Sequence, residues 1–296
     1  MSHNNHVIDG INKDLLGEYR TRDEYLALTN GFTSKLPKPI IQEFDGVKVV
    51  REDLLGVGGT KARAGEFLFS KIQHDTVVYC VPRVGHAGCA VVKLGKMYGK
   101  KVVLFMPSSK EISDHQAAAI QCGADNVIFH RIAAMPNLNR LAKKWADDNG
   151  AMFLPFGLNH PLVIAGFVRV CDDLMKIYEE PSSLWVAVST GVMCRGLQIG
   201  FPNTQMNGVA VARNMKYGEI GRTNLISEPL AFTDPEKPHN RPPFDSVATY
   251  DAKVWKYIPK NYGENVWFWN VAGEIHCDEK FDKSSINSYR DWEKNL

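Results

Sequence analysis

Short apolar runs alternate with amphipathic segments over most of the chain, from about residue 62 to residue 213. The apolar runs TVVYCV (76–81), KVVLFMP (101–107) and NVIFH (126–130) have the length and the β-branched content of buried strands. The segments between them space their apolar residues as helices do, and glycines stand where several of these helices should end. This alternation predicts right-handed βαβ units around parallel sheets. We therefore expect an α/β fold of two three-layer αβα domains with mostly parallel sheets.

Three parts of the chain depart from this pattern. Residues 1–40 are polar and are expected to form a surface arm or short helices, and 214–246 lack apolar periodicity and are expected to form a long loop. The tail 280–296 is expected to be a surface helix. Elsewhere the pattern predicts helices at 59–73, 87–99, 110–124, 137–150, 160–178 and 189–201, and further strands at 151–156, 184–188, 207–213 and 264–273.

Length and charge exclude several classes of protein. A chain of 296 residues with 44% hydrophobic residues can form one large domain or two medium domains that share a site. The formal net charge of +2 gives no bulk field that would attract nucleic acid or an anionic membrane. No apolar run approaches the roughly 20 residues that span a bilayer, and the first residues lack the apolar region of a signal peptide. We expect a cytoplasmic protein without a membrane partner, or one of the host cytoplasm for a viral relative.

Cysteine usage fits the same compartment. The chain has six cysteines, and none of them stands in a C-x-x-C pair. Most lie inside apolar runs, so we expect buried free thiols in a reducing environment. Cys277 follows His276, but two adjacent residues do not have the spacing of a zinc site, and no metal is expected.

A glycine-rich turn followed by a single lysine lies within VVREDLLGVGGTKARAGEFL, residues 49–68. The lysine, Lys61, could hold a phosphate, form a covalent bond to a carbonyl, or be solvated without a role. The spacing does not fit a P-loop, and no glycine lies three residues past Gly58 as a dinucleotide-binding turn requires. A cation at a helix N-terminus opposes the helix dipole. Burial and that dipole would lower the pKa of Lys61, which favours a Schiff base with a carbonyl compound.

This segment resembles the cofactor-lysine segment of fold-type II enzymes that use pyridoxal 5′-phosphate (PLP), the superfamily of the tryptophan synthase β subunit. The shared pattern is a basic residue, an acidic pair and a leucine, then the glycine-rich turn and the lysine, and the similarity extends over about residues 38–273. The chain looks most similar to the branch of 1-aminocyclopropane-1-carboxylate deaminase and D-cysteine desulfhydrase. The resemblance implies a large PLP-binding domain (1–60 and 161–296), a smaller α/β domain (61–160), and PLP in the cleft between them, bound to Lys61.

The loop VGHAG, residues 84–88, stands where the family has S-G-N-[TH]-G, a loop that holds the substrate carboxylate and O3′ of the cofactor. By this match His86 replaces the asparagine and could donate to O3′, with a packing or capping role as the alternative. No serine occurs between Thr76 and Met106, so the serine that the deaminase uses in this loop has no counterpart and the cyclopropane substrate is not implied. The residues implied to bind substrate are Val84, Gly85, His86, Ala87 and Gly88. Arg83, just before the loop, could pair with a substrate carboxylate or phosphate, or be a surface arginine.

Two later segments match the parts of the family that hold the phosphate and the ring. The turn STGVM (189–193) follows a predicted strand and opens a helix, so its N–H groups would receive the phosphate. In ATYDAKVW (248–255), Tyr250 would pack near the ring as a catalytic residue. Asp251 would keep the ring nitrogen protonated, and Asn270 would line the site. The residues implied to bind the cofactor are Lys61, His86, Ser189, Thr190, Gly191, Val192, Met193, Asp251 and Asn270.

The resemblance implies an enzyme of the deaminase or lyase type that acts on an amino acid or amino-acid-like amine. Lys61 would release the cofactor to the substrate amine and then serve as general base or acid, with a quinonoid carbanion as the intermediate. The alternatives are a decarboxylase or other Cα-bond-cleaving enzyme for a bulky amine such as a nucleotide-linked amino acid, and a PLP carrier without turnover. Trp255, Trp267 and Trp269 could stack on a base or pack in the core. Besides the small-molecule substrate, family analogy implies a homodimer.

Overall fold

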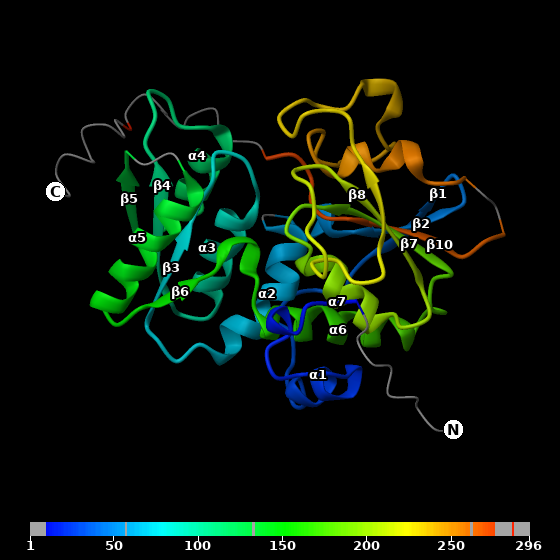
Figure 1. Ribbon diagram of the computed structural model, residues 1–296, viewed down its shortest axis with the longest axis horizontal. Coiled ribbons are helices and arrows are strands. Elements are labelled where there is room, and N and C mark those ends of the chain that lie inside the picture. Colours follow the sequence, from blue (N-terminus) through cyan, green and yellow to red (C-terminus); the bar gives the residue numbers. More distant parts are fainter. Residues whose placement is uncertain (1–9, 57, 132–133, 261–262, 276–285, 287–296) are drawn as a thin grey trace. The chain divides into compact units, whose positions relative to one another are not determined.

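The computed structural model describes residues 10–275, except 57, 132–133 and 261–262, and also residue 286 (Figure 1). Within these residues the chain divides into two compact units, one of 10–68 with Asn159–Glu274 and the other of Phe69–Leu158 with Ile275. The predicted tail helix and Cys277 lie outside the described residues. In the part of the chain that is described, no helix combines the length and the apolar character needed to cross a membrane.

The first unit is built on a six-stranded sheet in the order β1-β2-β10-β7-β8-β9. β1 and β2 form an antiparallel hairpin, and all other neighbouring strands are parallel; Trp267–Asn270 of β10 pair with Lys48–Arg51 of β2. Asp45 and Gly46 join the hairpin with φ angles of 51° and 76°, the left-handed conformation that Asp-Gly turns adopt. The strands are β1 (Ile41–Phe44), β2 (Val47–Arg51), β7 (Ser183–Val188), β8 (Gln205–Ala210), β9 (Asn224–Ser227) and β10 (Val266–Asn270).

Helices cover one face of this sheet, and short 3₁₀ segments cover the other. In Figure 1 α6 and α7 lie side by side below the sheet. They pack so closely that a Cβ built on Gly196 would lie only 2.4 Å from Cβ of Phe167. On the opposite face Val254 and Trp255 pack against strand residues that include Val49 and Phe268. The helical elements are η1 (Lys13–Leu15), α1 (Arg22–Leu28), η2 (Glu52–Leu55), α2 (Gly59–Lys71), α6 (Pro161–Met175), α7 (Val192–Gly200), η4 (Pro238–Asn240), η5 (Asp251–Lys253) and η6 (Trp255–Tyr257).

The three tryptophans that could have stacked on a base belong to the core. Trp267 and Trp269 have no exposed surface, and Trp255 is 6% exposed. The ring of Trp267 packs edge-on against Tyr178, with centroids 5.7 Å apart, and that of Trp269 packs against Phe167 at 6.4 Å. These rings therefore stabilise the first unit and offer no free face to a base.

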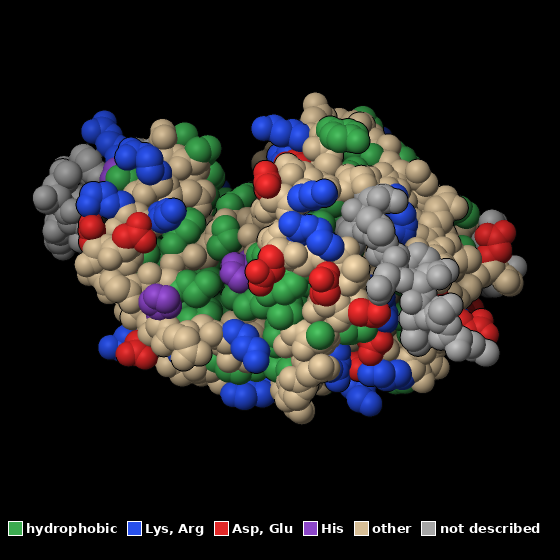
Figure 2. All heavy atoms as spheres, turned by 60° about the horizontal axis from the view of Figure 1, so that its bottom comes forward, with side chains coloured by type: hydrophobic (Ala, Val, Ile, Leu, Met, Phe, Trp, Pro, Cys, Tyr) green, Lys and Arg blue, Asp and Glu red, His purple; other side chains and the backbone are tan. Residues whose placement is uncertain are grey.

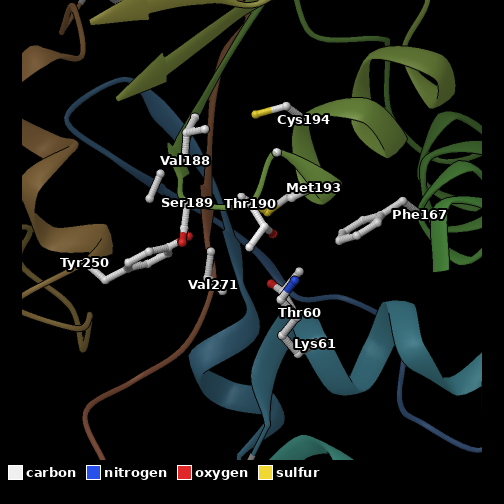
Figure 3. A pocket seen from close by; sticks show the side chains of 12 residues that line it. Thr60, Lys61, Phe167, Val188, Ser189, Thr190, Met193, Cys194, Tyr250 and Val271 are labelled. Atoms are coloured by element: carbon white, nitrogen blue, oxygen red, sulfur yellow. The ribbon is translucent and has the colours of Figure 1, made fainter. Parts of the chain in front are cut away.

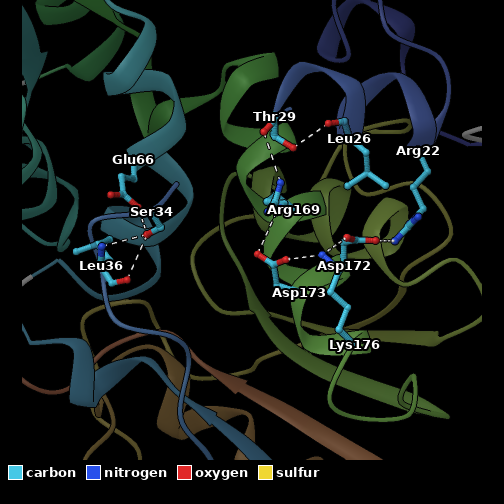
Figure 4. A network of polar contacts seen from close by, with 10 residues as sticks. All are labelled: Arg22, Leu26, Thr29, Ser34, Leu36, Glu66, Arg169, Asp172, Asp173 and Lys176. Carbon is cyan, nitrogen blue, oxygen red and sulfur yellow. Dashed lines mark hydrogen bonds and ion pairs between the residues drawn. The ribbon is translucent and has the colours of Figure 1, made fainter. Parts of the chain in front are cut away.

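An ion pair joins α1 to α6, and further ion pairs link charged residues along α6 and at its end (Figure 4). Arg22 Nη2 lies 2.7 Å from Asp172 Oδ1, and Lys176 Nζ lies 2.9 Å from Asp172 and 2.8 Å from Asp173. Arg169 pairs with Asp173 at 3.0 Å. On the face drawn in Figure 2, basic and acidic side chains of the described residues are interspersed, and neither kind forms a large patch.

The second unit has a four-stranded parallel sheet in the order β5-β4-β3-β6. Val78 and Val103 pack against Ala142 of α5 on one face. Val102 points to the opposite face, where a Cβ at Gly95 of α3 would lie 2.2 Å from Val102 Cγ2. The elements are β3 (Thr76–Cys80), α3 (Ala87–Met97), β4 (Lys101–Pro107), α4 (Asp114–Gln121), β5 (Asn126–His130), α5 (Met135–Asp148), β6 (Met152–Leu154) and η3 (Phe156–Leu158).

The predicted α/β class with mostly parallel sheets is confirmed, and the differences are local. The predicted loop 214–246 contains β9 and η4, because Leu225 and Ile226 pair at the sheet edge although their neighbours give no strand pattern. The helix predicted from residue 110 begins at Asp114, because Ser113 and Gln116 form a capping box that fixes its start.

Candidate active site

A pocket in the first unit is formed where the carboxyl ends of the parallel strands β7 and β10 meet the first turn of α2 (Figure 3). It encloses about 30 Å³, room for two or three water-sized groups, since about 10–15 Å³ of such space holds one water. Crevices at the carboxyl ends of parallel strands are the usual binding sites of α/β folds. The lining residues are Thr60, Lys61, Phe167, Ala187, Val188, Ser189, Thr190, Gly191, Met193, Cys194, Tyr250 and Val271.

The position of Lys61 is set by contacts between α2 and the end of β10. The N–H of Thr60 donates to Val271 O over 2.9 Å, and Thr60 Oγ1 accepts from the indole N–H of Trp269, also over 2.9 Å. Gly59 has φ +45°, and a Cβ there would lie 2.2 Å from Val271 O. Only glycine allows this approach of the two backbones, so the glycine-rich turn places Lys61 directly at the end of β10.

The amine of Lys61 is more easily deprotonated than that of an ordinary lysine. Burial is the larger cause, and the positive charge of Arg195 is the second; together they lower its pKa to about 8. A lysine with this pKa has a neutral, nucleophilic fraction at physiological pH. The pocket thus contains an amine that can attack a carbonyl carbon.

The turn after β7 is suited to an anion. Gly191 is the N-cap of α7, with φ 76°, and the first N–H groups of a helix have no partner within the helix. They and the helix dipole together favour a negative group at this end. Ser189 and Thr190 add hydroxyl groups, and Ser189 is hydrogen-bonded to the side chain of Tyr250 on the other side of the pocket (Figure 3).

Asp251 lies directly after Tyr250 and is completely buried. Its Oδ2 accepts hydrogen bonds from the N–H groups of Val271 (2.8 Å) and Ala272 (3.1 Å). Burial raises the pKa of this carboxyl well above its usual value, although the two N–H groups act in the opposite direction. Its Oδ1 has no hydrogen-bond partner among the described residues. Asp251 is therefore a buried acceptor that a cationic N–H donor would complete.

Asn270 is the last residue of β10 and is also buried. Its Nδ2 donates to Asp53 Oδ1 and to Asp245 O, both over 2.8 Å. Its Oδ1, like Oδ1 of Asp251, is buried without a partner in the described part of the chain. The Asn270 side chain thus links the end of β10 to the segments that contain Asp53 and Asp245.

The predicted substrate loop belongs to the second unit. Arg83 is exposed, and its Nη2 is 3.4 Å from Glu111 O. His86 is the N-cap of α3, and its ring centroid lies 5.5 Å from that of His115. Burial, and then His115, lower the pKa of His86 to about 3, so the imidazole is neutral and can donate one hydrogen bond. Its Nε2 has no partner within the described residues, which leaves the predicted role toward O3′ chemically possible.

The structure therefore brings together Lys61, Ser189, Thr190, Gly191, Met193 and Tyr250 in one pocket of the first unit. Val192 is fully buried beside the turn and does not line the pocket, and Asp251 and Asn270 flank its wall at Val271. Six further residues line the pocket and were not predicted as site residues: Thr60, Phe167, Ala187, Val188, Cys194 and Val271. Five of them adjoin the predicted turns or Asn270, whereas Phe167 comes from a helix without a motif, where its apolar character indicates only a core position.

A larger cavity in the first unit, about 610 Å³, does not share this chemistry. It lies between the segment 32–39, α2 and α6, and several of its charged residues are engaged by neighbours: Glu66 accepts from Ser34, and Asp173 pairs with Arg169 and Lys176 (Figure 4). Size alone does not make a site, so the smaller pocket with Lys61 is the candidate active site.

Comparisons with known proteins show the family of the chain and the likeness of its fold. Residues 29–241 match the family model described as Pyridoxal-phosphate dependent enzyme, and no curated protein matches the sequence. The fold is similar to that of an ACC deaminase homologue (TM-score 0.69, 18% identity, 85% of this chain and 95% of that one). It is also similar to threonine deaminase isoform 2 of Solanum lycopersicum (0.62, 14%, 94% and 94%) and to diaminopropionate ammonia lyase of Escherichia coli (0.62, 14%, 93% and 91%).

Proposed function

We propose that this chain, which belongs to the pyridoxal-phosphate dependent enzymes, is a deaminase or lyase that acts on an amino acid or amino-acid-like amine. The observation that carries the proposal is the pocket itself, in which an amine with a pKa of about 8 lies beside the N-terminus of α7. The names of the structures with a similar fold, an ACC deaminase homologue, a threonine deaminase and an ammonia lyase, support the reaction class.

The residues fit the cofactor at three points. Lys61 supplies an amine for the aldehyde, and the turn 189–193 supplies N–H groups for the phosphate. Asp251 supplies a buried oxygen that lacks a partner in the described chain, as the protonated ring nitrogen requires. When bound, the cofactor supplies an electron sink for negative charge at Cα of the substrate.

Each side chain then has a defined task. Nζ of Lys61 would hold the aldehyde carbon of the cofactor and, when free, would take a proton from Cα of the substrate and return it. Burial raises the pKa of Tyr250, so its hydroxyl stays protonated and keeps the Ser189 side of the turn in place. A cationic ring nitrogen would favour the charged form of the Asp251 carboxyl group. The carboxylate would in turn keep that nitrogen protonated and so strengthen the electron sink.

The proposal is tested first through binding. Wild-type protein titrated with PLP should gain a visible absorption band, and borohydride reduction should fix the cofactor on the peptide that contains Lys61. Lys61→Ala should abolish both signals. Lys71→Ala, at the exposed end of the same helix α2, is the matched control and should retain them. Unchanged labelling in Lys61→Ala would contradict the assignment.

The reaction class is tested with products. D- and L-amino acids should release ammonia and a keto acid from the PLP-loaded protein, whereas carbon dioxide would indicate the decarboxylase alternative. A bound cofactor whose spectrum no amino acid changes would indicate a carrier. We also propose a homodimer by analogy with the family, which light scattering of the purified protein would test.

A further inference from the structure

Arg195 is a buried cation with no acidic partner among the described residues. It is the fourth residue of α7 and has no exposed surface. Its Nη1 donates to Glu219 O over 2.6 Å and reaches Thr190 O at 3.5 Å, and its Nη2 donates to Asn159 Oδ1 over 2.6 Å. All three acceptors are neutral oxygens. They satisfy N–H groups of the guanidinium but do not neutralise its positive charge.

Glu219, the carboxylate that acts on Arg195 through its charge, forms its ion pair with another arginine. The carboxylate of Glu219 accepts from Arg213, with both oxygens 2.9 Å from the two guanidinium nitrogens. Nε of Arg195 has no hydrogen-bond partner in the part of the chain that is described. A buried charge without a counter-charge is costly, and an arginine cannot escape that cost by losing its proton.

The position of Arg195 in its helix adds to this cost. It lies in the first turn of α7, where the positive end of the helix dipole disfavours a cation. The guanidinium also lies close to the turn 189–193. A Cβ built on Gly191 would be only 3.1 Å from Nη1 of Arg195. An anion bound at the turn would remove both costs. A dianion would offset the positive charge of Arg195 and also the positive end of the α7 dipole.

We propose that Arg195 is a positioning residue that holds the phosphate turn by charge, so that the turn selects an aldehyde carrying a phosphate over one without it. This inference rests on the proposed function, because the phosphate in question is that of PLP. The guanidinium acts through Thr190 and Gly191, which line the pocket. Its charge also contributes to the state of Lys61, as the second cause of the lowered pKa after burial.

The chain offers a matched control for this residue. Gln198 is on the same side of α7 one turn later, and it holds the same segment as Arg195: Nε2 donates to Ile220 O over 2.8 Å, and Oε1 accepts from Arg222 N over 3.0 Å. Gln198→Met loosens the segment after Glu219 without removing a charge. A purely structural role of Arg195 would make the two variants behave alike.

The experiment compares PLP with pyridoxal, which lacks the phosphate. In Arg195→Gln the affinity for PLP should fall at least about tenfold more than the affinity for pyridoxal, and tenfold is the factor that 1.4 kcal/mol produces. The effect of Arg195 on Lys61 acts on both aldehydes and cancels in this ratio. Gln198→Met should leave the ratio of the two affinities unchanged, and Arg195→Lys should restore part of it. Equal loss for both aldehydes, or no loss, would overturn the proposal.

A second measurement does not need the covalent bond to the cofactor. Inorganic phosphate should raise the thermal stability of Lys61→Ala, and Arg195→Gln in that background should abolish this effect. Phosphate stabilisation that persists in the double variant contradicts the role of Arg195. If wild-type protein fails to bind PLP through Lys61, the proposed function falls, and the phosphate measurement still decides whether Arg195 serves an anion site.

Discussion

Trp269 donates its indole N–H to Oγ1 of Thr60 over 2.9 Å, and this hydrogen bond joins the end of β10 to the first turn of α2 beside Lys61. Both side chains are buried, with exposed fractions of 0% and 1%. The two residues are more than two hundred positions apart in the chain, so the contact ties the start of α2 to the strand that ends at Asn270. The position of Lys61 depends on this contact.

Thr60→Val is expected to destabilise the protein and weaken PLP binding together. The substitution preserves shape but leaves the buried N–H of Trp269 without its acceptor, which costs about 1–3 kcal/mol. Urea unfolding should show this loss, and a PLP titration should show a weaker complex. Thr60→Ser retains the hydroxyl and should lose less stability than Thr60→Val. A valine variant with unchanged unfolding would mean that the hydrogen bond does not hold α2 in place.

Gly59→Ala is expected to be more damaging than Gly56→Ala. Both glycines have positive φ, +45° and +76°, so each alanine is strained in its backbone; at Gly56 the ψ of −151° adds to this strain, because essentially only glycine adopts that conformation. Only at Gly59 would the new Cβ also collide with Val271 O, at 2.2 Å, whereas no described atom lies within 4 Å at Gly56. Because Gly56→Ala carries the larger backbone strain, a still greater loss of unfolding free energy in Gly59→Ala would report the contact of α2 with β10. A smaller loss in Gly59→Ala than in Gly56→Ala would contradict the prediction.

Continuous apolar runs with clear ends were the most predictable parts of the fold. KVVLFMP coincides with β4 because a buried parallel strand needs apolar residues on both faces and a proline ends it. The β1–β2 hairpin was not predicted, although Asp45–Gly46 is the sequence signal of such a turn. β9 has no comparable signal, because it is a short edge strand on which Leu225 is 38% exposed.

Only those site residues that belong to local sequence motifs could be predicted. The turn with Lys61 and the turn 189–193 are local patterns, so the sequence shows both, and the structure places residues of both in one pocket. Arg195 was not predicted, because its significance is the lack of a counter-charge, which depends on Asn159 and Glu219. Contacts between distant segments leave no periodic trace in a single sequence.

Cys122 is expected to be the most reactive of the described cysteines. Cys89 donates a hydrogen bond to it, and Lys96 and Lys93 lie near enough to lower its pKa further, against the effect of partial burial. Burial raises the pKa of Cys80 and of Cys194 to about 12. The thiolate is the reactive form, so a maleimide at neutral pH should label Cys122 first.

The labelling is best measured in a Cys277→Ser background, which confines the label to the described cysteines. Peptide mass mapping after short exposure should find Cys122 modified and Cys194 unmodified. Cys122→Ser should remove the fast phase, and Cys194→Ser should not. Fast labelling of Cys194 would show that the core around the pocket opens readily.

Asp251→Asn is expected to change the pH dependence of stability. Burial raises the pKa of Asp251 in the folded protein, while in the unfolded chain it takes an ordinary value of about 3.9. The folded state therefore holds the proton to higher pH than the unfolded state does. The contribution of Asp251 to stability is fully present below about pH 4 and is lost as pH rises through the folded pKa.

Without cofactor, Asp251→Asn should consequently gain stability relative to wild type between pH 4 and pH 8, by more than about 1.4 kcal/mol if the shift exceeds one pKa unit. The asparagine oxygen can still accept from the N–H groups of Val271 and Ala272. Urea unfolding across this range measures the difference, with Asp245→Asn, an exposed carboxylate near the same turn, as the control. Saturating PLP should reverse the order at pH 8, because the bound cation stabilises the carboxylate and not the amide. A constant difference at all pH values would show that Asp251 is already ionised without the cofactor.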